Sequence, residues 1–115
     1  MAAKRQVETK LRELIRRLDE AHEGQASLSD ALPEPRIVQV LVTDLGESYW
    51  TELSGGRMGP LNAGRPDQAD IRVGADSDVL VELVDGRRSI FSSYLAGKVK
   101  VEASFADLMR LRKLA

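Results

Sequence analysis

The residues of this chain that could do chemistry are few, and their spacing matches no catalytic or metal-binding pattern. The single histidine, His22, lies four residues after Leu18 on an apolar helical stripe, which is typical of a helix-end residue favoured by the helix dipole. A Ser-His-Asp triad would have to include it, but no serine lies in a nucleophile-elbow motif. The aspartates between positions 67 and 78 lack the spacing of a calcium loop, and we interpret them as turn and cap residues.

Two further kinds of chemistry find no support in the sequence. The segment SGGRMG (54–59) has glycines but no following Lys-Ser or Lys-Thr, so a hairpin turn explains it better than a phosphate-binding loop. The chain has no cysteine, which excludes thiolate catalysis, disulfides and sulfur-ligated metals. We therefore predict that the chain is not an enzyme and has no catalytic residue, metal site or cofactor. A hydrolase with an unrecognised carboxylate pair is the alternative.

Composition narrows the class of protein further. The 115 residues suffice for one domain with its own core, predicted to cover 1–115. The 17 Lys and Arg balance 18 Asp and Glu, and this net charge of −1 argues against nucleic acid as a partner. The N-terminal MAAKRQVETK lacks the apolar stretch of a signal peptide, and no segment has the roughly 18 apolar residues of a membrane span. A cytoplasmic protein is expected.

The elements of the first two thirds of the chain can be placed from periodicity and turn residues. Apolar residues at helical spacing predict an amphipathic helix that ends near Gly24, followed by a connector to Pro35 with a helical turn around Leu32. The stripe of that helix consists of Val7, Leu11, Leu14, Ile15 and Leu18. Strands are predicted at 36–43, 48–53, 57–62 and 69–74, and we interpret the segment 36–75 as an antiparallel meander.

Helices dominate the last third, 76–115. Asp76 or Ser77 is predicted to cap a helix that ends at Gly86, and a shorter helix follows and ends at Gly97. The alternation in 98–103 predicts a half-buried strand. Ser104, with Asp107 three residues later, predicts a capping box that starts the final helix. Segregated strands and helices indicate an α+β fold in which helices cover one face of a sheet.

The positive feature of the sequence is apolar side chains on these short helices. Such residues either fill a core or line a cavity, and periodicity alone leaves both alternatives open. The thirteen residues are Val79, Leu80, Leu83, Val84, Ile90, Phe91, Tyr94, Leu95, Phe105, Leu108, Met109, Leu111 and Leu114.

The order and spacing of several short motifs resemble the sterol carrier protein type 2 family. The resemblance is clearest from Asp70 to Ala115, in the series ADIRVGA, SDVLVELVDG, YLAGKVKVEAS and FADLMRLRKLA. As in that family, one helix ends at Gly86, the next ends at Gly97-Lys98, and a Val-Lys-Val strand follows. The closing Leu-Arg-Lys-Leu at 111–114 is also similar, and the meander from Arg36 to Gly64 agrees in layout.

The resemblance implies a five-stranded, mainly antiparallel sheet with helices packed on one face. It also implies non-catalytic binding or transfer of an apolar lipid, such as a fatty acyl chain, acyl-CoA, a phospholipid or a sterol-like molecule, in a tunnel between sheet and helices. The expected lipid-binding residues are Val79, Leu80, Leu83, Ile90, Phe91, Tyr94, Leu95, Phe105, Leu108 and Met109. Arg87 and Arg88, at a corner between two helices, are candidates to hold an anionic headgroup or to meet an anionic membrane surface.

The alternative is a protein-interaction or oligomerisation module of the same fold, with the tunnel filled by side chains. In that case a partner protein, including a partner enzyme, replaces lipid as the ligand. The sequence leaves the oligomeric state open.

Overall fold

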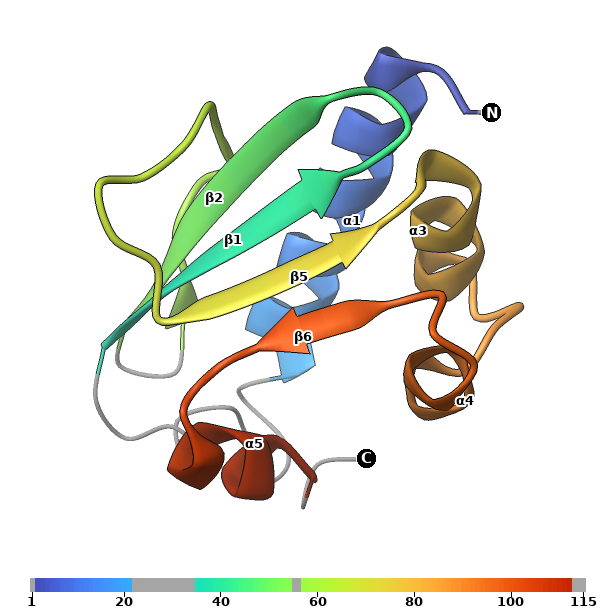
Figure 1. Ribbon diagram of the computed structural model, residues 1–115. Helices are drawn as coiled ribbons and strands as arrows, with labels where there is room; N and C mark the ends of the chain where they lie inside the picture. The colour runs from blue at the N-terminus through green and yellow to red at the C-terminus, as the bar shows by residue number, and fades with distance from the viewer. Residues whose placement is uncertain (1, 22–34, 55–56, 113–115) are drawn as a thin grey trace.

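The computed structural model describes residues 2–21, 35–54 and 57–112, and it is an α+β structure in which helices cover one face of a mixed sheet (Figure 1). His22, the connector up to Glu34 and the Gly55-Gly56 turn lie outside the described residues. The helices are α1 (Lys4–Ala21), α3 (Ser77–Val84), α4 (Ile90–Leu95) and α5 (Phe105–Arg112). The strands are β1 (Arg36–Val42), β2 (Glu47–Ser54), β3 (Arg57–Met58), β4 (Asn62–Ala63), β5 (Ile71–Ala75) and β6 (Lys100–Glu102).

The sheet is mainly antiparallel, as predicted, with one parallel pairing. Its strand order is β3-β2-β1-β5-β6, and β4 pairs with β2 beside β3. Only β1 and β5 run parallel among the described strands, in the register Val40 with Val73; the other pairs are antiparallel. The chain therefore leaves the meander after β4 and crosses to the free edge of β1. The prediction that the segment 69–74 continues the antiparallel meander is therefore wrong, because β5 pairs with β1 in parallel.

The predicted edge strand at 57–62 is interrupted in the structure. Two residues at each end pair with β2, and Gly59-Pro60 separates them. Proline has no N–H to contribute to a strand ladder, and this explains why pairing does not continue through Pro60. Gly59 still donates its N–H to the Glu52 carbonyl at 2.8 Å, so the interruption stays attached to β2.

The helix ends follow the predicted caps. The Asp76 carboxylate accepts a hydrogen bond from the Val79 N–H at 3.0 Å and so begins α3. Gly86 and Gly97 follow α3 and α4 with φ of +75° and +77°, a left-handed conformation that costs glycine no steric strain. These two residues turn the chain out of each helix and set the short lengths of α3 and α4.

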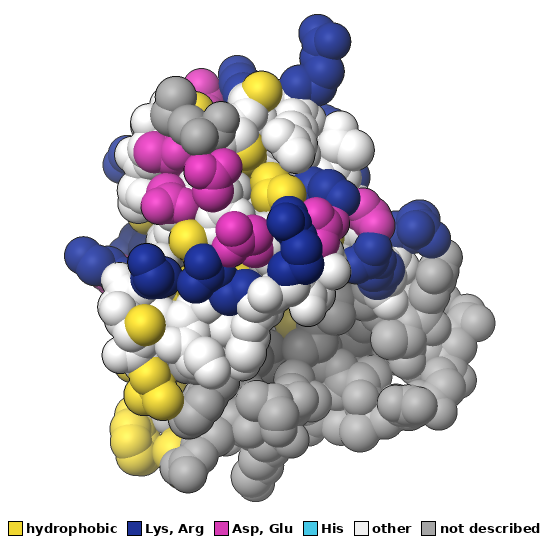
Figure 2. Space-filling model, turned by 90° about the vertical axis from the view of Figure 1, so that its right-hand side faces the viewer, with side chains coloured by type: hydrophobic (Ala, Val, Ile, Leu, Met, Phe, Trp, Pro, Cys, Tyr) yellow, Lys and Arg dark blue, Asp and Glu magenta, His cyan; other side chains and the backbone are white. Residues whose placement is uncertain are grey.

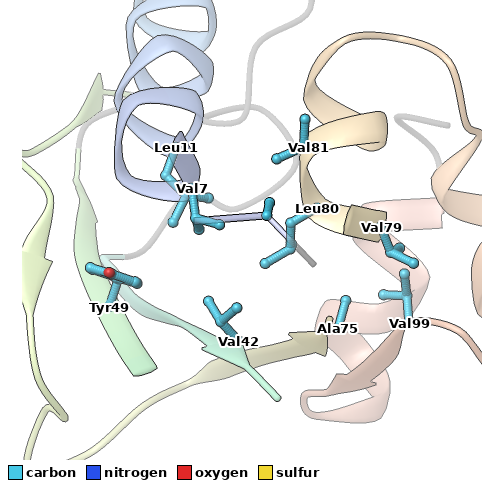
Figure 3. Close-up of a cluster of buried hydrophobic side chains, with 10 residues drawn as sticks. Val7, Leu11, Val42, Tyr49, Ala75, Val79, Leu80, Val81 and Val99 are labelled. Carbon is cyan, nitrogen blue, oxygen red and sulfur yellow. The ribbon is translucent and has the colours of Figure 1, made fainter. Parts of the chain in front are cut away.

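The main core lies between α1, α3 and the inner face of the sheet. Figure 3 shows Val7 and Leu11 of α1 pointing toward Val42 and Tyr49 of the sheet, with Leu80 of α3 beside them. All five side chains are buried, which removes their apolar surface from water. The remaining buried members of this main core are Ala2, Ala75, Val79, Val81 and Val99.

A polar network joins the start of the chain to the loop after β1. Ser77, which is fully buried, donates its hydroxyl to the Asp44 carboxylate at 2.6 Å and its backbone N–H to the same group at 2.8 Å. The Ser77 oxygen also accepts a hydrogen bond from the Ala2 N–H at 2.9 Å. Chiefly because of the Ser77 hydroxyl bond, the pKa of Asp44 is lowered from its ordinary value. The charged carboxylate therefore helps to fix the N-terminal end of α3.

Replacing Asp44 by asparagine tests this network. A carboxyl group whose pKa is lowered by folding stabilises the folded state above its unfolded pKa, about 4 for aspartate, and loses that contribution as the pH falls through the folded pKa. We expect D44N to melt below the wild-type protein at pH 7, and the difference to shrink toward pH 2. Thermal melts followed by circular dichroism measure it, with D67N at an exposed position as control. An equal difference at both pH values would contradict the prediction.

Candidate functional site

Strand alternation separates the sheet into an inner face toward the helices and an outer face. Val38, Val40 and Val42 of β1 face inward, opposite Thr51 and Tyr49 of β2. Beyond the main core, the inner face carries a second apolar group, which we call the inner cluster. Its members are Val38, Leu53, Met58, Ile71, Val73 and Ala103. All six side chains are apolar, and Leu53 and Ile71 among them are buried.

α5 is attached to the sheet beside this cluster by a buried ion pair. The Arg36 guanidinium at the start of β1 donates to both oxygens of Asp107, at 2.9 and 3.1 Å, and the two side chains are only 11% and 6% exposed. Such two-pronged pairing fixes orientation as well as distance. Half of the predicted capping box is also present, since the Ser104 hydroxyl accepts from the Asp107 N–H at 3.1 Å.

The predicted lipid-binding residues fall into three groups. Val79 and Leu80 are buried in the main core, and Leu83 packs half-buried against it. Leu108 of α5 is half-buried. The exposed members are Ile90, Tyr94, Leu95, Phe105 and Met109, and the side chain of Phe91 lies outside what the structure describes. The structure thus brings together the α3 members, whereas most of those on α4 and α5 face outward.

The predicted headgroup arginines are engaged by acidic side chains of their own chain. Arg88 contacts Glu82 at 2.7 Å, and Arg87 contacts Asp85 at 3.2 Å. Asp85 also accepts from Lys10 of α1, and this bond is the main reason why the pKa of Asp85 is lowered. An anionic ligand at this corner would have to compete with these carboxylates.

Trp50 lies on the outer face of the sheet, since it alternates with the buried Tyr49 on β2. It lines an open hollow of about 420 Å³ along the β2 edge, together with Glu52, Met58 and Pro60. Met58 also belongs to the inner cluster, so its side chain contacts both the hollow and that cluster. Trp50 fluorescence therefore reports on this hollow rather than on the space between sheet and helices.

Tyr49 is a buried member of the main core whose side chain carries a hydroxyl group. Its hydroxyl donates to the Glu8 carboxylate of α1 at 3.3 Å, and burial, reinforced by the charge of Glu8, raises the pKa of Tyr49 to about 12. The phenol thus stays a neutral hydrogen-bond donor at physiological pH. In the part of the chain that the structure describes, no group of three His, Cys, Asp or Glu side chains is placed to hold a metal ion.

A mixed sheet covered on one face by helices, with an apolar inner face, defines a small α+β domain. The sequence matches the SCP-2 sterol transfer family over residues 4–115, and the chain belongs to this family. Family membership implies lipid binding or transfer by a domain that is not itself catalytic. Within the described ranges no helix is long and apolar enough to cross a membrane.

Solved structures agree with the fold. The palmitated SCP2L2 of Aedes aegypti is similar with a TM-score of 0.66 at 11% identity, over 98% of this chain and 94% of that one. The ubiquinone synthesis protein UbiJ-SCP2 is similar with a TM-score of 0.60 at 18% identity, over 99% and 92% of the two chains.

A larger enzyme contains a similar unit. The sec-alkylsulfatase Pisa1 of Pseudomonas sp. aligns with 68% of this chain at 18% identity and a TM-score of 0.56. The present chain covers only 12% of that enzyme. A comparison with curated proteins found no match.

The buried pair between Arg36 and Asp107 gives a testable prediction about α5. Replacing Arg36 by methionine keeps the apolar stem but removes both hydrogen bonds that the guanidinium donates to the buried Asp107 carboxylate, which should cost about 3 kcal/mol of unfolding free energy. Lys4→Ala breaks an exposed pair with Glu47 and should cost at most about 1 kcal/mol. Urea titrations measure both changes. Hydrogen exchange should also show faster exchange in 105–112 for R36M, and unchanged α5 protection would contradict the proposed attachment.

Proposed function

We propose that this chain binds an apolar lipid between the inner face of its sheet and its helices, without chemical conversion of the ligand. The observation that carries the proposal is the inner cluster, which presents apolar side chains from four strands, β1, β2, β3 and β5, on the helix-covered face. Family membership gives the same ligand class independently. The residues proposed to contact lipid are this cluster and those predicted lipid-binding residues that are buried or half-buried, namely Val79, Leu80, Leu83 and Leu108.

Energetics favour a long-chain ligand over a small polar one. Burying ten methylene groups of an acyl chain releases about 8 kcal/mol, at roughly 0.8 kcal/mol for each group. Lost freedom of the ligand offsets several kcal/mol of this gain, so micromolar affinity follows without a specific polar contact. Such a site depends on apolar surface that fits the ligand rather than on particular polar residues. A specific sequence motif is therefore not required.

A second candidate function is an interaction module whose interior is filled by its own side chains. It is favoured by the close contact of Val42, Tyr49 and Leu80 in the main core and by apolar side chains that face solvent on α4. Such a chain would stay free of lipid and would bind a partner through its surface. The two functions differ in what co-purifies with the protein.

Native mass spectrometry of the gently purified protein, followed by organic extraction, distinguishes the two functions. A lipid carrier should retain a mass that extracts into organic solvent or should take up added palmitate, acyl-CoA or phospholipid. A protein that remains unliganded after incubation with all three would overturn the proposal and favour the interaction module.

A variant that fills the interior sharpens this test. Ala103 is half-buried in the inner cluster, so A103F places an aromatic ring where the ligand chain is proposed to lie. We expect A103F to lower the amount of bound palmitate at least tenfold. The matched control, A63F, adds the same side chain at an exposed position of β4 and should bind normally. Circular dichroism checks that both variants fold, and normal palmitate binding by folded A103F would argue against this site.

A further inference from the structure

Nearly every acidic side chain that the structure describes is engaged by a group of its own chain. Arg88 contacts Glu82, for example, and Figure 2 shows Lys and Arg side chains directly beside acidic ones. The other described carboxylates accept hydrogen bonds or pair with cations, with two exceptions. These exceptions are Glu52 and Asp67, and both residues are exposed. A single unpaired carboxylate is ordinary at a protein surface, so its surroundings decide whether it can recognise a ligand.

The surroundings of these two carboxylates differ. Asp67 lies in a bend between β4 and β5 and is not among the residues that line the hollow beside Trp50. Glu52 does line this hollow. Because Glu52 and Trp50 are two residues apart on β2, both side chains project from the outer face of the sheet. Figure 1 shows α1 on the opposite side of the sheet, so this helix does not cover them.

The hollow combines an aromatic ring with oxygen atoms that can accept hydrogen bonds. Trp50, Met58 and Pro60 contribute apolar surface to its volume of about 420 Å³, and Glu52 and Asn62 contribute polar groups. The amide nitrogen of Asn62 donates to the carbonyl oxygens of Pro60 and Trp50 at 3.1 and 3.4 Å. Its amide oxygen is left as an acceptor. The hollow therefore offers an acceptor amide and a negative charge beside the indole of Trp50.

A guanidinium group matches these features better than other common ligand groups. It is planar and positively charged and only donates hydrogen bonds, so it can stack on an aromatic ring and pair with a carboxylate at the same time. An ammonium group has the charge without the plane, and a neutral urea group has the plane without the charge. An anionic group would be repelled by Glu52.

From this arrangement we infer that the hollow binds an arginine side chain of a partner protein, with the guanidinium stacked on Trp50 and paired with Glu52. The hollow is open and lies along the edge of the sheet that β3 and β4 form, where a side chain projecting from another polypeptide can enter. The inference goes beyond the proposed lipid binding and does not rest on it, because the lipid is proposed to lie on the inner face of the sheet.

The fluorescence of Trp50 tests the inference with the full chain, because Trp50 is the only tryptophan in the sequence. Titration with the peptide acetyl-Gly-Arg-Gly-amide at constant ionic strength should change the Trp50 emission and reach saturation. The same peptide with citrulline in place of arginine should give no saturable change, and the lysine peptide should bind more weakly. An equal response to the citrulline peptide, or no saturable response to the arginine peptide, would overturn the inference.

A pair of variants tests the role of the Glu52 carboxylate. E52Q and D67N each remove one exposed, unpaired carboxylate, but only Glu52 lines the hollow. E52Q should bind the arginine peptide about three- to fivefold more weakly, as expected for the loss of an exposed ion pair, whereas D67N should bind it normally. Circular dichroism checks that both variants fold. Undiminished binding by E52Q, or an equal loss in D67N, would contradict the proposed contact.

Two further measurements distinguish the source of the guanidinium group. Sedimentation velocity of the protein alone should show no self-association that depends on Glu52. A dimer that dissociates in E52Q would assign the hollow to an arginine of a second copy, and tighter binding of free arginine than of the capped peptide would assign it to a small molecule. Either outcome would overturn the assignment to a partner protein. Palmitate uptake, measured separately, reports on the inner face and can fail while arginine binding persists.

Discussion

The position of β1 between two neighbouring strands is the constraint on which the rest of the structure depends. β1 pairs with β2 along one edge and with β5 along the other, so neither edge is left to solvent. Because side chains alternate across a strand, this double pairing fixes Val38, Val40 and Val42 on the inner face. A shift of one residue in the register of β1 would turn these valines to the outer face and bring Gln39 to the apolar inner face.

Polar contacts, rather than apolar packing alone, hold the helices against that sheet. α3 is tied to the loop after β1 through Ser77 and Asp44, and α5 is tied to the start of β1 through Asp107. Directed contacts of this kind specify orientation, which apolar contact does only weakly. They would suit the proposed lipid carrier, because its helices would have to keep their places around a bound chain.

Local features such as helix caps and helix ends could be predicted from the sequence, whereas pairings between residues far apart in the chain could not. The cap at Asp76 and the helix ends at Gly86 and Gly97 depend on neighbouring residues, and the structure has them where predicted. The parallel pairing of β5 depends on where the chain crosses, which no local pattern encodes. Asp107 was predicted as a cap, but its carboxylate pairs with Arg36, 71 residues away in the sequence. For the same reason, periodicity found the apolar residues of α4 without revealing which of them face solvent.

The carboxylate of Asp85 contacts cations from two separate elements, Lys10 of α1 and Arg87 of the corner before α4. Asp85, directly after α3, thus affects both the packing of α1 beside α3 and the charge of the corner before α4. A substitution that removes this carboxylate breaks both contacts at once and leaves Lys10 with Glu13 alone, so it alters the attachment of α1 and makes the corner more basic in a single step. We therefore expect the effects of substitutions at positions 10, 85 and 87 on stability not to be additive.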